Sequence, residues 1–223
     1  MIYAVTELVR EIRIALDQNM SSEALADLGD IDTLSLDELI DSKIEDAARL
    51  VVQSAPAVLL GSGKAFGETI GWDMAAGYGS GHIVLPDDFL RLIVFQMSDW
   101  SMPVNLAIDE TSPLYSRQKS RYAGVRGNPQ RPVVAIVQQP IGNVLEFFSC
   151  EQGEDVYIKM ARYVPLPKKY TLDDEEVIEL PDKLSRAVVY YAAYLVAVAQ
   201  QQTEQAKGCL AVCQELMGGT VTV

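Results

Sequence analysis

The stretch "HIVLPDDFLRLIVFQM" at residues 82–97 decides how the middle of this chain is interpreted. Pro86, Asp87 and Asp88 are typical of a turn, in which an aspartate side chain accepts hydrogen bonds from neighbouring backbone N–H groups. The apolar runs on either side of this turn predict two β-strands. The middle of the chain is therefore expected to be a β-rich region.

The second of these strands carries large apolar side chains on both faces. One face holds Phe89, Arg91, Ile93 and Phe95, and the other holds Leu90, Leu92 and Val94. A strand with apolar groups on both sides is covered on both sides. We expect the C-terminal helix over one face and another subunit over the other, so the segment is interpreted as an internal support and not as an active site.

Further strands are predicted across the same region, where glycine and proline become frequent and the apolar pattern has a period near two. They are "GHIVLP" (81–86), "FLRLIVFQ" (89–96), "RPVVAIVQ" (131–138), "NVLEFFSC" (143–150) and "DVYIKMARYV" (155–164). A long loop with at most one short helical turn separates the second strand from the third. Residues 61–180 are thus expected to form an antiparallel β-rich insertion.

Helices are predicted at both chain ends. Residues 3–18 form an amphipathic pattern whose charged positions exclude a signal peptide. A second helix begins at Ser35, where Glu38 completes a capping box and Leu34 and Leu39 form a hydrophobic staple, and it stops or kinks at Pro56.

A single long helix is predicted over 181–217, followed by an extended tail over 218–223. Its apolar part, Ala187–Ala199, is too short to span a bilayer, which needs about 20 residues. The fold class is α+β, with a helical bundle formed by the N-terminal helices (1–60) and the long C-terminal helix, and the β region inserted between them.

The composition limits the possible partners. The formal net charge is −13, with 31 acidic and 18 basic residues, so nucleic acid is repelled from the surface as a whole. Three cysteines do not form a secreted disulfide framework, and a reducing compartment fits them better.

Catalytic and metal-binding patterns are weak. Gly63-Lys64 lacks the first glycine and the Ser/Thr of a phosphate-binding loop, so a flexible loop is preferred. His82 is the only histidine, and a local hydrogen bond is a simpler interpretation than a catalytic triad. Cys209 and Cys213 lie one helical turn apart and are interpreted as core cysteines, because no further histidine or cysteine cluster completes a metal site.

Acidic side chains gather in two places, and paired carboxylates can hold Mg²⁺ or transfer protons. Since connectors and helix starts favour acids, a solvated face is the preferred interpretation. The two groups are Asp27, Asp30, Asp32, Asp37, Glu38 and Asp41, and Asp173, Asp174, Glu175 and Glu176.

One loop opposes the overall charge. It contains no acidic residue and interleaves Tyr115 and Tyr122 with Arg117, Lys119, Arg121, Arg126 and Arg131. Three interpretations stay open: contact with an acidic partner, including another copy of the chain; a plain solvated loop; and a site for single-stranded nucleic acid.

The order of elements, together with "LPDDFLRL" at the start of a strand, resembles the head-to-tail adaptor (connector) family of tailed bacteriophages. The longer string with "VFQMSDW" and "GVRGNP" is similar to portal-vertex ring proteins of crAss-like phages. The order of elements covers nearly the whole chain, whereas the specific motif covers residues 82–100.

This resemblance implies a structural virion protein without catalytic residues, cofactor or metal. About a dozen copies would form a ring at the portal vertex, assembled in the host cytoplasm, that extends the DNA channel and presents a docking surface to tail proteins. DNA would pass without specific binding, repelled by acids such as those at 23–32 and 173–176. The basic loop would face a neighbouring copy or the DNA. The docking tail toward the portal protein would be Gly218, Gly219, Thr220, Val221, Thr222 and Val223.

Other functions are compatible with the same residues. A more distal ring or tail-completion protein of the same assembly is one. A small acidic cytosolic enzyme that uses a metal ion is a second, and an acidic module whose basic loop binds single-stranded nucleic acid is a third. None of the interpretations includes a membrane.

Overall fold

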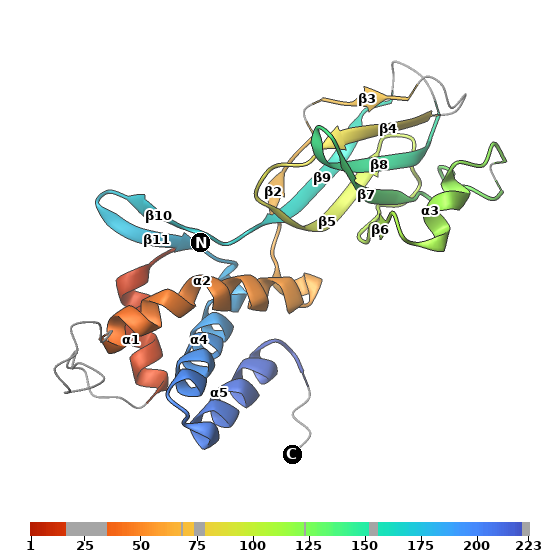
Figure 1. The fold of residues 1–223 in the computed structure, drawn as a ribbon. Coiled ribbons are helices and arrows are strands. Elements are labelled where there is room, and N and C mark those ends of the chain that lie inside the picture. Colours follow the sequence, from red (N-terminus) through yellow and green to blue (C-terminus); the bar gives the residue numbers. More distant parts are fainter. Residues whose placement is uncertain (17–34, 68, 74–78, 123, 152–155, 220–223) are drawn as a thin grey trace. The chain divides into compact units, whose positions relative to one another are not determined.

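A computed structural model gives the fold (Figure 1) and describes residues 1–16, 35–67, 69–73, 79–122, 124–151 and 156–219. The chain divides into two compact units. Unit 1 comprises Met1–Gly61 and Leu166–Val223, and unit 2 comprises Ser62–Pro165. The mixed α+β class expected from the sequence is confirmed.

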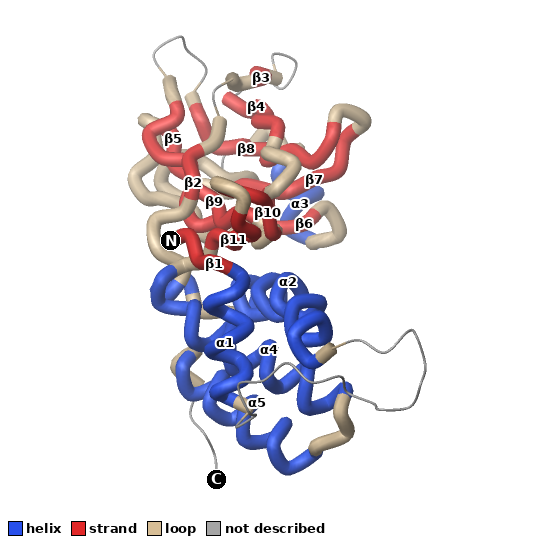
Figure 2. The backbone as a smooth tube through the Cα atoms, turned by 90° about the vertical axis from the view of Figure 1, so that its left-hand side faces the viewer, coloured by secondary structure: helices blue, strands red, loops and turns tan. Residues whose placement is uncertain are grey.

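Unit 1 combines helices with one small sheet. Its elements are β1 (Ile2–Ala4), α1 (Val5–Ala15), α2 (Leu36–Ser54), η1 (Ala57–Leu59), β10 (Lys169–Leu172), β11 (Glu175–Glu179), η3 (Asp182–Leu184), α4 (Ser185–Ala199) and α5 (Thr203–Leu216). Figure 2 shows its helices, in blue, gathered in one body.

The small sheet corrects two expectations. Residues 2–4 are the strand β1 and not the start of the first helix, and β1 pairs antiparallel with β11, which pairs with β10. The β-rich insertion expected over 61–180 therefore ends at Pro165, because the last two strands belong to unit 1. Neighbour pairing across the sheet, and not the local pattern, makes this division.

Helix α2 begins as its sequence predicts. The backbone N–H of Glu38 donates to Oγ of Ser35, and the backbone N–H of Ser35 donates to Oε2 of Glu38, so the capping box is confirmed. The staple residue Leu34 lies outside the described residues. Arg13 of α1 is buried and its Nη1 lies 2.8 Å from Oδ1 of Asp37, so Asp37 joins the two N-terminal helices and is not simply solvated.

Helix α4 is the centre of unit 1 and packs against α1, α2 and α5. Its buried side chains are Ala187, Val188, Val189, Ala192, Ala193, Val196 and Ala197, which face buried positions of α1 and α2 such as Ile12, Ile40 and Ile44. Each large aliphatic group removed from water contributes about 1.5–3 kcal/mol. In the described part of the chain, no helix is both long and apolar enough to cross a membrane.

The single helix predicted over 181–217 is wrong, and with it the bundle of two N-terminal helices and one long C-terminal helix. Gln201 has a φ of 60°, and the N–H groups of Gln201 and Gln202 donate to the carbonyls of Val198 and Ala197. This Schellman-type cap ends α4. The expected helix would have continued straight on, but the chain instead starts α5, which packs against α4.

Unit 2 contains two sheets. Its elements are β2 (Lys64–Ala65), β3 (Gly71–Trp72), β4 (Gly79–Val84), β5 (Phe89–Met97), β6 (Ile108–Asp109), α3 (Pro113–Gln118), β7 (Val134–Gln139), β8 (Gly142–Cys150) and β9 (Ile158–Pro165). One sheet has the order β2-β9-β5 and the other β3-β4-β8-β7-β6. All five longer strands were predicted from the sequence, and every pair is antiparallel except β6 with β7.

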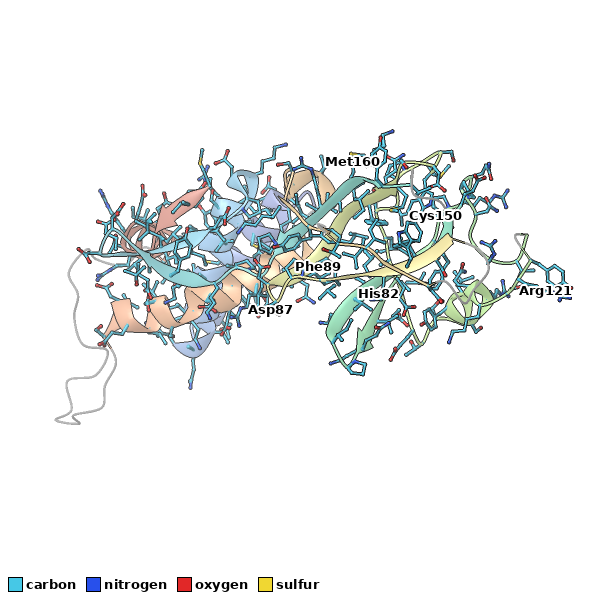
Figure 3. All side chains as sticks on the ribbon, turned by 90° about the horizontal axis from the view of Figure 1, so that it is seen from above. His82, Asp87, Phe89, Arg121, Cys150 and Met160 are labelled. Atoms are coloured by element: carbon cyan, nitrogen blue, oxygen red, sulfur yellow. The ribbon has the colours of Figure 1, made fainter. Side chains whose placement is uncertain are left out.

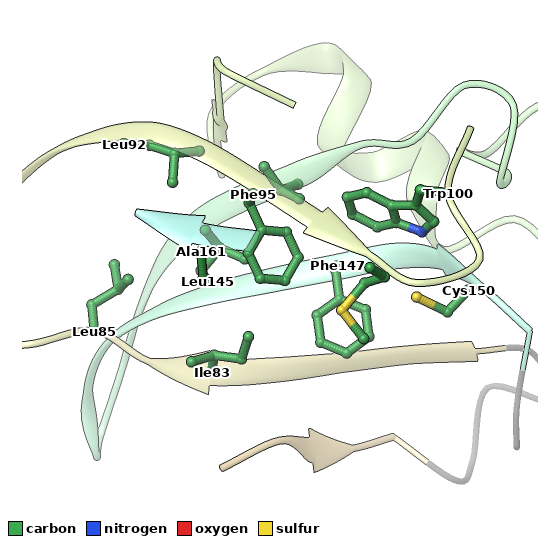
Figure 4. Packing of buried hydrophobic residues seen from close by; sticks show 11 residues of the cluster. Ile83, Leu85, Leu92, Phe95, Trp100, Leu145, Phe147, Cys150 and Ala161 are labelled. Atoms are coloured by element: carbon green, nitrogen blue, oxygen red, sulfur yellow. The ribbon is translucent and has the colours of Figure 1, made fainter. Parts of the chain in front are cut away.

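The core of unit 2 lies between strands of the two sheets (Figure 4). Phe95 and Phe147 are fully buried, and Phe95 packs edge-on against Trp100 with ring centroids 5.5 Å apart. The cluster consists of residues of unit 2, so the C-terminal helix expected over one face of β5 is not part of it. The face of β5 that enters this core is covered by residues of other strands, such as Ile83 of β4 and Phe147 of β8.

The strict alternation expected along β5 is also wrong. Its pairing with β9 shifts between Phe89 and Arg91, between Leu92 and Val94, and again after Gln96. Such bulges place an extra residue in one strand, so the side chains after the bulge point to the opposite face from the one that strict alternation gives. Leu92 and Phe95, three positions apart, consequently enter the same core. In the preceding turn, Asp88 accepts a hydrogen bond from the hydroxyl of Tyr163 at 2.7 Å, a side-chain partner that the turn pattern does not reveal.

Candidate functional site

The basic loop contains the short helix α3 and the turns after it. Oγ of Ser112 accepts a hydrogen bond from the N–H of Leu114, and Pro113 occupies the first turn of the helix. Gln118 is 3% exposed; its Nε2 donates to the carbonyl of Leu114, and its Oε1 accepts from the N–H of Gly127 at 2.7 Å. One buried amide thus ties both ends of the loop together.

Arg126 differs from the other four cations of the loop. Its Nη1 donates to the carbonyls of Gly127 (3.2 Å) and Phe148 (3.1 Å), so it anchors the loop to β8. The five basic residues form one group in the sequence, but in the structure Arg126 has a role within the subunit. The remaining four, Arg117, Lys119, Arg121 and Arg131, are exposed.

Aromatic rings support two of the exposed cations. Nζ of Lys119 lies 5.4 Å from the ring centroid of Tyr115, and the guanidinium of Arg121 lies 5.0 Å from that of Tyr122. Such cation–π contacts position a charge without neutralising it. Figure 3 shows Arg121 projecting away from the strands. Exposed apolar side chains, Leu114, Tyr122 and Val125, lie among these cations in the sequence. We call residues 114–131 the basic segment.

A cavity of about 740 Å³ opens beside the basic segment on the five-stranded sheet. It is lined by Trp72, Asp73, Ser80, Gly81, His82, Tyr115, Lys119, Arg121, Gln139, Glu146 and Phe148. This volume falls within the range of about 300–1,000 Å³ that is usual for ligand pockets. Strands from distant parts of the sequence therefore bring the basic segment to a hollow.

Glu146 is held in place at this cavity. The hydroxyl of Tyr115 donates to Oε2 and the Nε2 of Gln139 donates to Oε1, each at 2.8 Å. Burial, together with this hydrogen bond and the charge of Glu146, raises the pKa of Tyr115 to about 12, so the phenol stays a donor. Both oxygens of the carboxylate are thus already used by the protein.

His82 and Ser80 project from β4 beside Glu146. His82 pairs in register with Glu146 on one side and with Gly71 on the other, and a Cβ at Gly71 would collide with its imidazole ring. Ser80 is 4% exposed, and its hydroxyl has no hydrogen-bond partner among the described residues. A buried polar group without a partner is uncommon, so this hydroxyl is available to a bound group.

The acidic patch at 173–176 is the tip of a β-hairpin. Leu172 pairs with Glu175, so Asp173 and Asp174 alone form the turn, with φ values of 50° and 65° (Figure 1). Two positive φ values define a turn that favours Asn-Gly. Tyr170 and Leu172 beside this tip are also exposed. We call residues 170–176 the acidic hairpin tip; a sequence pattern search misses it because Asp-Asp is not a usual hairpin turn.

The other acidic group predicted from the sequence includes residues outside the described part of the chain and residues with local partners. Asp27, Asp30 and Asp32 lie outside the described residues, as does the whole connector at 23–32. Asp41 forms an ion pair with Lys169 of β10.

The net charge differs strongly between the units. Unit 1 has 20 acidic and 9 basic residues, which gives −11, and unit 2 has 11 acidic and 9 basic residues, which gives −2.

The predicted docking tail begins inside a helix cap. Gly218 has a φ of 80°, its N–H donates to the carbonyl of Glu215, and the N–H of Gly219 donates to that of Gln214. These bonds are a Schellman motif that ends α5. Thr220, Val221, Thr222 and Val223 lie outside the described residues.

Other predicted positions have local structural roles. Lys64 and Ala65 form β2, and a Cβ at Gly63 would overlap the carbonyl oxygen of Tyr163, so this stretch is a strand with a close approach and not a flexible loop. Cys209 and Cys213 are buried in α5 as expected, and burial raises the pKa of both thiols. Among the described residues, no group of three or more His, Cys, Asp or Glu side chains is placed to hold a metal ion.

Unit 1 also has two shallow hollows along α4. One, of about 390 Å³, lies beside α1 and includes Ile14 and Tyr190. The other, of about 590 Å³, lies beside α2 and includes Leu50 and Val198, which are about half exposed.

Comparison with known proteins gives no matching family model and no matching curated protein.

Proposed function

We propose that this chain is a structural subunit of a ring at the portal vertex of a tailed bacteriophage, where it connects the portal to the tail and extends the DNA channel. The observation that carries the proposal is the division of the chain: both ends fold into one helix-rich unit, and a β-rich unit is inserted between them. This division agrees in outline with the order of elements that the resemblance to head-to-tail adaptors implies, although α4 and α5 replace the single long C-terminal helix of that order.

The surfaces of the chain support assembly. Ile14, Leu50 and Val198 of unit 1 are exposed along hollows beside α4. In unit 2, Leu114, Tyr122 and Val125 are exposed among cations. Exposed apolar groups bordered by charge are typical of protein–protein interfaces. A ring subunit needs separate surfaces of this kind for its two neighbours and for the rings above and below it.

The charge distribution supports a channel function. Unit 1 carries −11 of the net charge of −13. A channel wall lined by carboxylates repels the phosphates of DNA and lets the duplex slide. Unit 1 is therefore the part of the subunit that would face the lumen, and its localisation would be the portal vertex of the virion.

Electron microscopy of the purified protein, alone and mixed with a purified portal ring, tests this function. Closed rings of about a dozen copies, or added density on the portal ring, are the expected result. Removal of residues 220–223 provides a matched variant, because the helix cap at Gly218 and Gly219 stays intact. That variant should fold normally and bind the portal more weakly. A protein that forms no ring and adds no density to the portal would contradict the proposal.

A further inference from the structure

We propose that the acidic hairpin tip of one copy docks on the basic segment and cavity of unit 2 of the next copy. The proposal rests on the proposed ring function and names the two surfaces that hold neighbouring subunits together. Because the surfaces are different, each copy offers one of each, and the contact is of the head-to-tail kind that closes into rings.

The acidic hairpin tip is shaped to present charge. Asp173, Asp174 and Glu175 are exposed, and none forms an ion pair with a cation in the described part of the chain. Glu176 alone is near a cation, with Oε2 at 3.6 Å from Nζ of Lys169. Aspartates at two positive-φ positions are locally unfavourable compared with Asn-Gly, and their like charges repel. A partner that binds these carboxylates gives a physical reason for this turn sequence.

The basic segment offers the matching charges. Arg117, Lys119, Arg121 and Arg131 are exposed, and none forms an ion pair with a described carboxylate. Lys119 and Arg121 also line the cavity beside the segment. The buried Ser80 hydroxyl lines the same cavity and has no partner among the described residues, so a bound carboxylate or backbone group can complete its hydrogen bonding.

Apolar groups accompany the charges on both sides. Tyr170 and Leu172 are about two-fifths exposed beside the acidic turn, and Leu114 and Tyr122 are exposed within the basic segment. Burial of apolar area would supply the affinity, and the opposite charges would set the orientation. Solvated loops without a partner gain nothing from this combination of exposed apolar groups and single-sign charge.

Single-stranded nucleic acid fits the same segment less well. A polyanion would be attracted by four cations but repelled by the remainder of a chain with a net charge of −13. The cavity is also lined by Asp73 and Glu146, which disfavours a continuous phosphate backbone.

Two variants separate the surfaces. In K119E/R121E the basic segment is reversed and the hairpin is intact. In D173N/D174G the hairpin tip loses two charges but gains the preferred turn sequence, so a loss of association cannot arise from unfolding. Sedimentation of the full chain is measured at low salt and at 1 M salt, where the Debye length falls to about 3 Å.

The wild-type protein should associate at low salt to species larger than a dimer, and 1 M salt should weaken this association. Each variant alone should associate at least about tenfold more weakly. An equal mixture should form a dimer that grows no further, because only one complementary pair of surfaces remains.

Three results would overturn the contact. If both variants form rings as well as the wild type does, the ring function would hold but the proposed contact would be wrong. A mixture that stays monomeric while the wild type associates would mean that the two surfaces do not meet between copies. Binding of a single-stranded oligonucleotide that K119E/R121E abolishes, without an effect on self-association, would assign the segment to nucleic acid. A wild-type protein that neither associates nor binds the portal would instead overturn the proposed function itself.

Discussion

The ammonium group of Lys169 in β10 lies 2.8 Å from Oδ2 of Asp41 in α2. The same nitrogen also lies 3.3 Å from the backbone carbonyl of Asp41. Lys169 is only 14% exposed at its side chain, so this pair fastens the acidic hairpin to the second helix. The hairpin that carries the proposed contact is thus held on a rigid element of unit 1.

Replacing Lys169 by Met should destabilise unit 1 by about 1–2 kcal/mol, because a partly buried ion pair and its hydrogen bonds are lost. A double-mutant cycle with Asp41→Asn should show a coupling of about 0.5–1.5 kcal/mol. Urea unfolding measures both. Additive effects of the two substitutions would mean that the pair contributes no interaction of its own.

The same pair predicts a dependence on pH. Burial opposes the charged form of Lys169, but the hydrogen bond and charge of Asp41, with Glu176, outweigh it and raise the pKa. The stabilisation is therefore complete below the unfolded pKa of about 10.4 and is lost as the pH rises through the folded value. The stability difference between the wild type and Lys169→Met should be constant near neutral pH and shrink once the pH rises beyond the unfolded pKa of lysine. A difference that shrinks on acidification between pH 8 and pH 6 would contradict this assignment.

Gln118→Leu should release the basic segment. The substitution leaves the N–H of Gly127 and the carbonyl of Leu114 without their buried partner, at a cost of about 2–3 kcal/mol. Trypsin should then cleave after Arg117, Lys119 or Arg121 faster than in the wild type. Gln118→Glu keeps the acceptor for Gly127 and should be cleaved at an intermediate rate. Equal cleavage of all three proteins would show that Gln118 does not hold the segment.

Two nearby glycines provide a test of close packing. Gly61 and Gly63 both have positive φ, but a Cβ at Gly61 meets nothing within 4 Å, whereas one at Gly63 would overlap Tyr163. Gly61→Ala should cost about 1 kcal/mol from backbone strain alone. Gly63→Ala should cost at least about 2 kcal/mol more, because β9 must shift. Thermal unfolding that ranks the two alike would disprove the close approach.

The turn substitution D173N/D174G should stabilise the folded chain by about 1 kcal/mol, since Gly adopts positive φ without a Cβ penalty and one like-charge repulsion is removed. A rise in the urea midpoint at an unchanged slope would confirm it. Asp173→Asn alone, which keeps Asp174, should give a smaller rise. A lower midpoint would mean that Asp174 makes a stabilising contact within the subunit.

Some features followed from local patterns. The capping box at Ser35 and Glu38 requires only residues three apart, and the strands over 89–96 and 143–150 follow from apolar runs bounded by turn residues. The excess of acids and the basic loop were also evident in the sequence, as was the burial of Cys209 and Cys213. Each of these depends on near neighbours along the chain.

Other features depended on contacts between distant residues. The helix break at Gln201 has no glycine or proline to mark it, because the cap is stabilised by backbone bonds to Val198 and Ala197. Arg126 could be separated from the other cations of its loop only once β8 placed the Phe148 carbonyl beside it. The bulges in β5 likewise arise from its pairing with β9.

The sequence by itself determined the α+β class, the principal strands, the start of α2 and the charge balance, because spacing, turn chemistry and charge are properties of neighbouring residues. Only the tertiary structure decided that α4 and α5 are separate helices, that β10 and β11 leave the β region, and that the basic segment borders a cavity. Those outcomes depend on strand pairing and side-chain packing between residues far apart in the chain, which no local pattern specifies.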